Sequence, residues 1–411
     1  REDFTDIKRA TFDECVDFIV KDCDAALASK YLPYRTTEDG ERGRMTKAIA
    51  YFIKTSALLF AASPHWNPNN DASKWQAAAK AGKEAIDSVV AHGYSLFPDY
   101  ERFFITRPDK NKNPLDKETI LEAIDSWGYG SEPYRRFPVI TFLMNMIPND
   151  FASEKCGLCP SQELVDSYEM KTGEVAITGY EDEAHTRPII NTASTYDDQK
   201  PYENRDPRFY ATVWYNGAYF GDKDGRHIYI ESFVGGRHGI DGVKQRTPTG
   251  YYTRKYVDPS MRSAGAGTTL WRIYRLAELY LDLAEAENEA NGPTQIAYDA
   301  ANATRLRAGM PVLPAGLTKD QFRERIRRER RVEMALEENR FYDVRRWNIL
   351  EDNSRLKTGM RWVKANDGTL SNTRIQSVDC HATADPKYYV LPIQLKEIIR
   401  MPLVKQNPGW E

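Results

Sequence analysis

The densest group of charged side chains lies in residues 323–333, where arginines and glutamates intermingle over about three helical turns. Glu329 and Glu333 are four residues apart, a spacing that places two carboxylates on one helix face, as acid–base catalysis requires. However, the apolar stripe of Phe322 and Ile326 extends by helical spacing to the same two glutamates, which predicts that both point inward. Buried carboxylates need partners, and the adjacent arginines supply them. We therefore interpret this stretch as structural ion pairs. The same network is predicted to include Asp343, Arg345 and Arg346, beside Trp347.

Large aromatic side chains stand in segments rich in glycine and proline. Trp127, Tyr129 and Tyr134 fall within one such segment, Trp66 lies between two prolines, and Tyr219 follows an Asn-Gly turn. Rings in loops have no helix face to bury them, and sugars stack on such rings while polar side chains bind their hydroxyls. We expect these five residues to form a ligand-binding platform, with Trp66 the weaker candidate. The alternative is that the rings pack back on the rest of the protein.

Two acidic clusters suggest a different chemistry, and they are Glu181-Asp182-Glu183 and Asp197-Asp198. Carboxyl pairs about 5 Å or about 6.5–9.5 Å apart hydrolyse glycosidic bonds, and sequence spacing does not fix such a distance. A glycoside hydrolase that uses these carboxylates is therefore an alternative to a binding protein, although solvated loop charges are the simpler interpretation. A peptide-binding helical-repeat scaffold is a second alternative.

Cys156-Gly-Leu-Cys159 is the chain's one C-x-x-C motif. A closed zinc site needs a second nearby pair, which the sequence lacks, so a plain loop, a local disulfide and a metal site remain open in that order. The six histidines show no metal-binding spacing, and no nucleophile elbow, phosphate-binding loop or dinucleotide motif occurs. We expect no metal, no cofactor and no catalytic residue.

Composition narrows the class of protein further. The chain has 411 residues, 41% of them hydrophobic and 12% aromatic, and a formal net charge of -3. It therefore has no basic excess for nucleic-acid binding. No apolar run approaches the ~20 residues that span a bilayer.

The elements that must position these residues divide into three parts. Residues 1–94 carry helical periodicity and read as a scaffold, with Thr11, Thr46 and Asp71 as helix caps. Alanines at contact positions are typical of stacked, tetratricopeptide-like helix pairs.

Residues 95–267 are dense in Gly, Pro, Tyr and Asn and predict an irregular, partly β, ligand-binding insert. Its β-like runs are 210–214 and 227–230. Residues 268–411 return to helices, beginning near Thr269 with Ile273 on the buried stripe and with Thr318 as a later cap, followed by a C-terminal tail. The expected fold is a single mainly α domain in which helix pairs carry this insert.

Several runs of the chain share their order and spacing with one known family. These runs are 275–286 (RLAELYLDLAEA), 302–311 (NATRLRAGMP), 326–333 (IRRERRVE), 339–347 (NRFYDVRRW), 391–393 (LPI), 406–410 (QNPGW), 160–168 (PSQELVDSY) with Gly173, and 205–208 (RDPR). From about Gly43 to the C-terminus, the sequence thereby resembles the SusD/RagB family of nutrient-binding outer-membrane lipoproteins. Asn339 departs from the family pattern, which often has a glycine or histidine-glycine turn there.

The resemblance implies a function as well as a fold. Such proteins are not enzymes; they bind oligosaccharides, or peptides in some members, and partner a SusC-like TonB-dependent transporter. They are held at the cell surface by a lipidated N-terminal cysteine, which is not among these residues. Because the family's first helices also precede Arg1, we expect a truncated N-terminus. The resemblance carries over no ligand contacts, so the five aromatic residues remain the site prediction.

Overall fold

The computed structural model describes residues 4, 6–38, 41, 43–105, 116–122, 158–223, 225–241, 246–257, 271–351, 356–381 and 385–411. The helices described are α1 (Phe12–Ala28), α2 (Lys47–Ala62), α3 (Ala72–Ala91), α4 (Tyr100–Ile105), α6 (Gln162–Ser167), α7 (Pro207–Thr212), α8 (Leu276–Asn291), α9 (Gln295–Arg307), α10 (Lys319–Glu333), α11 (Asn339–Arg346), α12 (Leu395–Arg400) and the 3-10 helix η4 (Pro386–Tyr389). The strands described are β1 (Thr119–Glu122), β2 (Ile177–Tyr180), β3 (Pro188–Ile190), β4 (Val213–Trp214), β5 (Tyr219–Lys223), β6 (Arg226–Tyr229), β7 (Tyr252–Thr253), β8 (Arg272–Arg275), β9 (Leu356–Lys364) and β10 (Leu370–His381).

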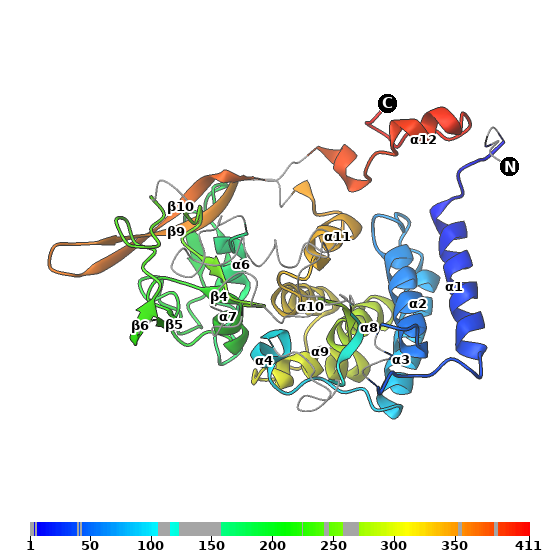
Figure 1. The fold of residues 1–411 in the computed structure, drawn as a ribbon, viewed down its shortest axis with the longest axis horizontal. Coiled ribbons are helices and arrows are strands. Elements are labelled where there is room, and N and C mark those ends of the chain that lie inside the picture. Colours follow the sequence, from blue (N-terminus) through cyan, green and yellow to red (C-terminus); the bar gives the residue numbers. More distant parts are fainter. Residues whose placement is uncertain are drawn as a thin grey trace.

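The helices form a stack that brings together segments from both ends of the chain. Helix α1 packs on α2, α2 on α3, α3 on α8, and α8 on both α9 and α10 (Figure 1). The fold is therefore mainly α, with the tetratricopeptide-like stacking that the sequence predicts. Gly82 shows how close the helices lie, since a Cβ there would sit 3.3 Å from Leu283 Cβ of α8.

The residues predicted to cap helices stand at the N-termini of helices in the structure. Thr11 and Glu14 form a complete capping box at α1, and the side chains of Thr46 and Asp71 accept backbone N–H groups at the start of α2 and α3. Thr318 and Gln321 form a second capping box at the start of α10. These bonds satisfy N–H groups that a helix start otherwise leaves unpaired.

The main core lies between α2, α3, α8, α9 and α10. Its members include Phe52, Val89, Leu279, Leu283 and Phe322, all no more than 3% exposed. Burial of these large apolar side chains holds the five helices together.

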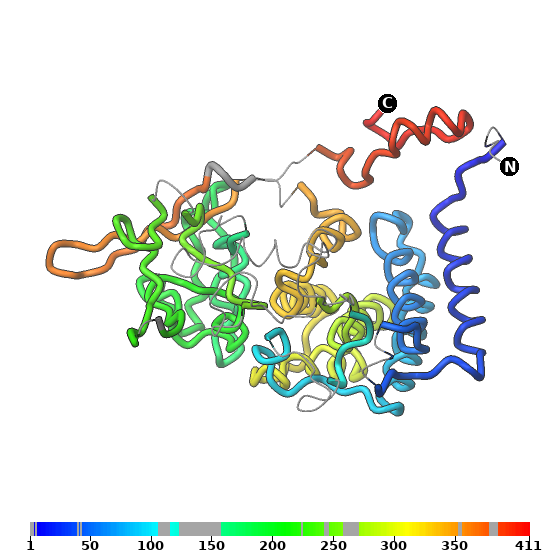
Figure 2. Tube along the Cα trace, viewed as in Figure 1, coloured from blue at the N-terminus to red at the C-terminus, as the bar shows by residue number. Residues whose placement is uncertain are grey.

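The middle of the chain supplies short two-stranded sheets and two aromatic cores. Strand β2 pairs with β3, β4 with β7, and β5 with β6, all antiparallel, while β1 pairs across the chain with β8. The first aromatic core contains the buried rings of Phe104 and Trp214, and the second contains Phe209. Figure 2 shows the segments around β4, β5 and β6, in green, on the side of the molecule away from α1 and α2.

Two expectations about local structure are wrong. Residues 210–214 were expected to be β-like, and only 213–214 are, as strand β4. Residues 210–212 belong to helix α7, because Asp206 caps its first turn and Pro207 fits its start. Helix α8 begins at Leu276 and not near Thr269, and Ile273 lies 43% exposed on strand β8. The pairing of β8 with β1 overrides the helical periodicity there.

The turn before α11 is built from residues with side chains. Leu336 and Glu338 adopt φ values of 64° and 68°, in the left-handed region, directly before α11 begins at Asn339. The bend is therefore made without a glycine, at a conformational cost that the surrounding packing must offset.

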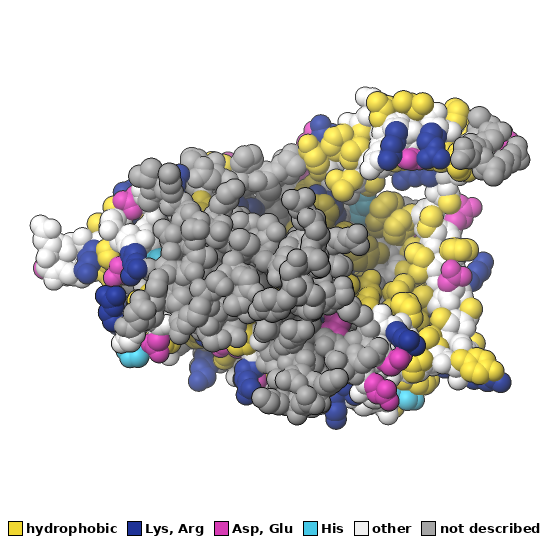
Figure 3. Space-filling model, viewed as in Figure 1, with side chains coloured by type: hydrophobic (Ala, Val, Ile, Leu, Met, Phe, Trp, Pro, Cys, Tyr) yellow, Lys and Arg dark blue, Asp and Glu magenta, His cyan; other side chains and the backbone are white. Residues whose placement is uncertain are grey.

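Beyond α11, a long hairpin and a C-terminal arm complete the chain. Strands β9 and β10 pair antiparallel, and the arm with η4 and α12 returns to the N-terminal end, where Arg9 donates to Asn407 Oδ1 (Figure 1). Hydrophobic side chains gather on this arm in Figure 3. Its exposed large apolar residues are Leu391, Leu395, Ile399 and Leu403. No helix among the described residues has the length and apolar character to cross a membrane.

Candidate functional site

The structure describes two of the five predicted aromatic residues. Trp127, Tyr129 and Tyr134 lie outside the described residues, so their placement stays a prediction. Tyr219 begins strand β5, and Trp66 lies in the connection between α2 and α3. These two rings are not brought together, because the β5–β6 hairpin and the α2–α3 end lie at opposite ends of the molecule (Figure 1).

Tyr219 is exposed and has a partner that the sequence reasoning missed. Tyr219 and Tyr229 are 46% and 52% exposed, face each other in register across β5 and β6, and have ring centroids 5.7 Å apart. His227 lies 5.9 Å from Tyr219, edge to face. Strand alternation explains the arrangement, since Phe220 and Ile230 point into the core while their neighbours point out. The alternation His227-Ile-Tyr229 was the signal available in the sequence.

The hairpin thus presents an aromatic edge on a rigid base. Phe220 is 4% exposed and packs against Trp214, with ring centroids 4.5 Å apart. The phenol rings above it offer both a C–H-binding surface and a hydroxyl, the combination that carbohydrate recognition uses. We name Tyr219, Tyr229 and His227 the hairpin edge.

Trp66 lies in a different setting. Its indole stacks on Phe12 at 3.9 Å between centroids and 7° between planes, so α1 covers one face of the ring. His65 meets Trp66 edge to face and itself stacks on Tyr389 of the C-terminal segment. Trp66 thereby ties α1 to the α2–α3 connection, and its role in binding stays a prediction.

The insert carboxylates are engaged in local contacts. Asp182 accepts the Thr186 hydroxyl at 2.5 Å and the Arg187 N–H at 2.8 Å, and these hydrogen bonds lower the pKa of its carboxyl. Asp197 caps the turn that follows it, and Asp198 pairs with Arg374 at 3.0 Å. A general acid in a glycosidase needs a raised pKa, so the shift at Asp182 runs in the opposite direction.

The two glutamates at helical spacing form buried ion pairs, as predicted. Glu329 is 2% exposed and accepts Arg208 Nη1 at 2.5 Å and Arg305 Nη1 at 3.2 Å. Glu333 is fully buried and accepts Arg275 Nη1 at 2.7 Å. Burial alone would raise their pKa, but the guanidinium groups outweigh it and hold the pKa of both carboxyls below the usual 4.5. Their arrangement is therefore structural.

A second buried network surrounds Arg330. Its guanidinium pairs with Asp282 at 2.6 Å and Asp343 at 2.8 Å, and Arg346 contacts the same Asp343 at 2.9 Å. Asp343 and Arg346 thus join the charges of α10 as predicted. Arg345 does not, because it donates to backbone carbonyls, one of α11 and one of the C-terminal segment.

Three cavities in the described part of the chain are of interest for ligand binding. The largest, about 540 Å³, lies where the α2–α3 connection meets α8, α10 and α11, and falls in the size range of ligand pockets. Trp75 and Trp347 line it but are only 4% exposed, and Trp347 Nε1 donates to Glu285. Glu289, also in its lining, receives both Nε and Nη2 of Arg323.

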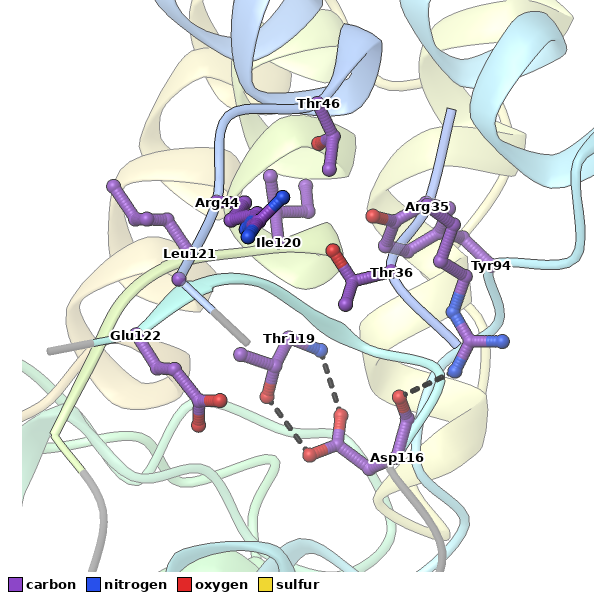
Figure 4. A pocket seen from close by; sticks show the side chains of 11 residues that line it. Arg35, Thr36, Arg44, Thr46, Tyr94, Asp116, Thr119, Ile120, Leu121 and Glu122 are labelled. Atoms are coloured by element: carbon purple, nitrogen blue, oxygen red, sulfur yellow. Dashed lines mark hydrogen bonds between the residues drawn. The ribbon is translucent and has the colours of Figure 1, made fainter. Parts of the chain in front are cut away.

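The smallest cavity lies between residues 35–46, Tyr94 and β1 (Figure 4). Arg35 donates to the Asp116 carbonyl at 2.7 Å, and the Asp116 carboxylate accepts both the N–H and the hydroxyl of Thr119. Its volume of about 40 Å³ leaves room for water and little else. These contacts anchor β1 against the helices.

The third cavity, about 170 Å³, lies between α6, β2, α10 and the start of β9. We name it the junction pocket, because it joins the middle of the chain to the helix stack. Its lining residues are Glu163, Asp166, Ser167, Ile177, Thr178, Gly179, Tyr180, His185, Arg328, Arg331 and Lys357.

The helix stack with its ring-rich insert is the architecture that the sequence motifs predict. Residues 117–410 match the model of the SusD family, and the chain therefore belongs to the SusD family. This confirms the resemblance drawn from the sequence motifs.

Similar proteins agree with this assignment. "SusD-like protein P25" of Formosa agariphila is 35% identical over 138 residues, a match that covers 33% of this chain and 23% of that relative. The matched segment thus spans less than a quarter of that relative's length. A crystal structure of a SusD-like protein from Bacteroides fragilis is 29% identical, with a TM-score of 0.75 over all of this chain and 73% of that one.

Two more distant structures share the fold. One is a SusD-like carbohydrate-binding protein from Bacteroides fragilis, 22% identical, with a TM-score of 0.69 over 98% of this chain and 72% of that one. The other is surface glycan-binding protein A from Bacteroides uniformis, 20% identical, with a TM-score of 0.54 over 97% of this chain and 70% of that one.

Proposed function

We propose that this protein is the glycan-binding component of a cell-surface nutrient-uptake complex and has no catalytic role of its own. The observation that carries the proposal is the hairpin edge, where Tyr219 and Tyr229 lie exposed side by side on a buried base. Membership in the SusD family and structural neighbours named for carbohydrate and glycan binding support it.

In this proposal, the ligand is captured by ring stacking and hydrogen bonding. Tyr219 and Tyr229 supply surfaces for sugar C–H faces, and His227 supplies a polar edge. The rings of Trp127, Tyr129 and Tyr134 are proposed to extend this platform, with Trp66 as a weaker contributor.

The proposed partner is a SusC-like TonB-dependent transporter in the outer membrane, to which the protein delivers its glycan. The proposed attachment is a lipidated cysteine on the N-terminal side of Arg1. Membership in the SusD family supports both proposals.

Calorimetric titration against a panel of soluble oligosaccharides tests the binding function. We expect a glycan to bind, and the double variant Tyr219→Ala/Tyr229→Ala to bind it about ten-fold or more weakly, since tenfold corresponds to about 1.4 kcal/mol of lost contact. Tyr31→Ala is the matched control, because Tyr31 is 84% exposed on the N-terminal side of the helix stack.

A triple Ala variant at Trp127, Tyr129 and Tyr134 tests the other predicted rings in the same assay.

Three outcomes would count against the proposal. Equal affinity of the Tyr219→Ala/Tyr229→Ala variant and the wild type would show that the hairpin edge does not bind the glycan. Release of reducing ends from a bound polysaccharide, lost on substitution of Asp197 or Glu183, would favour a hydrolase, and binding of peptides but no glycan would favour the peptide scaffold.

A further inference from the structure

The largest cavity is lined by residues from distant parts of the chain, and we name it the tryptophan cavity because Trp75 and Trp347 line it. The α2–α3 connection, helices α8 and α10, and the residues directly after α11 contribute the rest of the lining. Its volume of about 540 Å³ is in the range of small-ligand pockets. The partners of its charged groups show which of them remain able to bind a ligand.

Three of the charged groups in this lining have strong partners. Glu285 accepts both Nη groups of Arg346, at 2.5 and 2.7 Å. Glu289 accepts Arg323 Nε at 2.5 Å and Nη2 at 2.6 Å, and it also lies 3.6 Å from Lys319 Nζ. The hydrogen-bonding capacity of Glu285, Glu289 and Arg323 is therefore largely used inside the protein.

Arg327 of α10, also in the lining, makes no hydrogen bond to a described residue. Its Nε is buried without a partner, and its guanidinium lies over the Trp347 ring, 4.8 Å from the centroid. Its Nη1 lies 3.6 Å from Glu324 Oε1, which is beyond hydrogen-bond distance, and the Glu324 side chain is 71% exposed. Burial lowers the pKa of Arg327, and the charges of Glu285 and Glu324 offset only part of that shift. The guanidinium thus has donor capacity that the protein does not use.

Two asparagines add further donors to the lining. Asn70 Oδ1 accepts Trp75 Nε1 at 3.2 Å, and Asn348 Oδ1 contacts His65 Nδ1 at 2.9 Å. Each contact fixes the orientation of the amide, and within the described ranges neither Nδ2 group donates a hydrogen bond. The cavity therefore presents amide donors from the α2–α3 connection and from the residue after Trp347, in addition to the guanidinium of α10.

The groups that remain unused favour a neutral ligand rich in hydroxyls. They are the donors of Arg327, Asn70 and Asn348 and one acceptor, the carboxylate of Glu324. An anionic group would use only the donors, and the lining contains three glutamates against two arginines. A sugar hydroxyl both accepts and donates a hydrogen bond, so neighbouring hydroxyls of one ring match both kinds of group.

We propose that the tryptophan cavity is a second glycan-binding site, in which a neutral sugar accepts hydrogen bonds from Arg327 and Asn348 and donates one to Glu324. The proposal rests on the proposed glycan-binding function and adds a site to the hairpin edge. The β5–β6 hairpin and the α2–α3 connection lie at opposite ends of the molecule, so short glycans occupy the two sites independently (Figure 1).

Nuclear magnetic resonance of isotope-labelled tryptophan tests where the sugar binds. The indole N–H groups of Trp75 and Trp347 bond to Asn70 and Glu285 in the lining, and Trp75→Phe and Trp347→Phe assign their signals. The probes are neutral hexasaccharides of glucose, xylose, mannose and galactose. We expect at least one to shift both signals, with an affinity that changes little as salt rises. If every hexasaccharide that binds leaves both signals unmoved, the proposal is wrong.

Calorimetric titration of the Tyr219→Ala/Tyr229→Ala variant isolates this site from the hairpin edge. We expect the hexasaccharide that shifts the two signals to retain residual binding, and Arg327→Gln in that background to weaken it ten-fold or more. Arg328→Gln is the matched control, because Arg328 is the next residue of α10 but lines the junction pocket. Thermal unfolding of each variant verifies that it is folded.

A second variant removes a donor and leaves the backbone unchanged. Asn348 has a φ of 55°, a conformation that glycine adopts readily, so Asn348→Gly deletes the side chain without strain. We expect this variant to weaken the residual binding several-fold. Asn204→Gly is its control, because Asn204 has a φ of 53° and is also exposed but does not line the cavity.

The outcomes separate this proposal from the broader one. Loss of all hexasaccharide binding in Tyr219→Ala/Tyr229→Ala, together with unchanged binding in Arg327→Gln, would overturn the tryptophan cavity and leave the glycan-binding function intact. Failure of every hexasaccharide would overturn both. Shifts of the two tryptophan signals by a blocked tetraglycine peptide, and by no sugar, would overturn both as well and indicate a peptide ligand.

Discussion

Arg208 shows how much of this protein's charge has a structural use. It is 1% exposed, and its guanidinium reaches Asp206 at 2.7 Å, Glu329 at 2.5 Å and Glu333 at 3.0 Å. A planar group with five donors can hold several carboxylates at once, which an ammonium group cannot do in the same geometry. Buried charges of this kind are costly when one partner is removed, which makes single arginines good test sites.

Arg346→Ala should strongly destabilise the fold. Arg346 binds Glu285 through two contacts of 2.5 and 2.7 Å, and its loss would leave a buried carboxylate uncompensated. We expect the free energy of unfolding in urea to fall by about 3–5 kcal/mol. Arg345→Ala is the control, and since Arg345 contacts backbone carbonyls near the surface we expect a loss of about 1 kcal/mol or less. Equal effects of the two variants would contradict the buried role of Arg346.

At the scale of elements, α10 connects the parts of the molecule. One side of this helix carries Glu329 and Glu333 toward the network around Arg208, another carries Arg330 toward α8 and α11, and Arg328 faces the junction pocket. The position of the whole helix therefore sets both ion networks and the pocket.

Thr318→Ala should loosen the start of α10. The Thr318 hydroxyl accepts the Gln321 N–H, and the Gln321 side chain accepts the Thr318 N–H in return. Removal of the hydroxyl is expected to lower the free energy of unfolding by about 1 kcal/mol. Ser161→Ala at the start of α6 is the matched control, because Ser161 makes no side-chain cap bond and should change stability little. The hypothesis fails if both variants are equally stable in thermal unfolding.

Local signals predicted the elements that depend on local contacts. Caps such as Thr46 and Thr318 and the apolar stripe through Phe322 identify helices because each involves neighbours three or four residues apart. Strand β8 depends on β1, some 150 residues earlier, so its pattern alone read as helix. The β9–β10 hairpin was missed for a related reason, since the signals of its turn around Gly368 sit in a region otherwise rich in helical pattern.

The candidate sites were predicted less completely than the fold. Composition pointed to Tyr219 as a loop ring, and only strand register reveals that Tyr229 faces it. The junction pocket joins Glu163, Arg328 and Lys357 from three separate segments. No local pattern in the sequence signals such a combination, because only the packing of three distant segments brings these residues to one cavity.

At the scale of the whole molecule, buried ion pairs join the helix stack to the rest of the chain. Arg275 reaches Glu118, Lys255 reaches Glu337, and Arg305 reaches Glu169, at 2.7–2.9 Å. These links couple segments that are far apart in sequence, so we expect the protein to unfold as one cooperative unit at neutral pH. Its stability should then vary with pH through the buried carboxyls.

Individual buried carboxyls change stability with pH in opposite directions. Nearby cations outweigh the effect of burial and lower the pKa of Glu333 and Glu337 below 4.5, so their stabilisation is complete above pH 4.5 and is lost as pH falls below it. Glu278 behaves in the reverse way, because burial and the neighbouring Asp282 raise its pKa to about 8. Folding then holds a proton that the unfolded chain releases, and stability declines as pH rises from 4.5 toward 8.

Glu278→Gln should therefore remove the decline between pH 5 and pH 7.5. Glu278 shares Arg330 with Asp282 and Asp343, and Asp343 also contacts Arg346, which pairs with Glu285. The carboxylates here outnumber the guanidinium groups, and a neutral amide at 278 relieves that competition while still accepting a hydrogen bond. We expect the wild type to lose roughly 1 kcal/mol or more of unfolding free energy across this range, and Glu278→Gln to lose little. Urea titrations followed by circular dichroism at pH 5, 6, 7 and 7.5 measure both. Glu287→Gln, on the same helix but bonded to Asn291 and Thr294, should keep the wild-type slope. A wild-type protein whose stability is constant or rises over this range would show that Glu278 is ionised in the folded state.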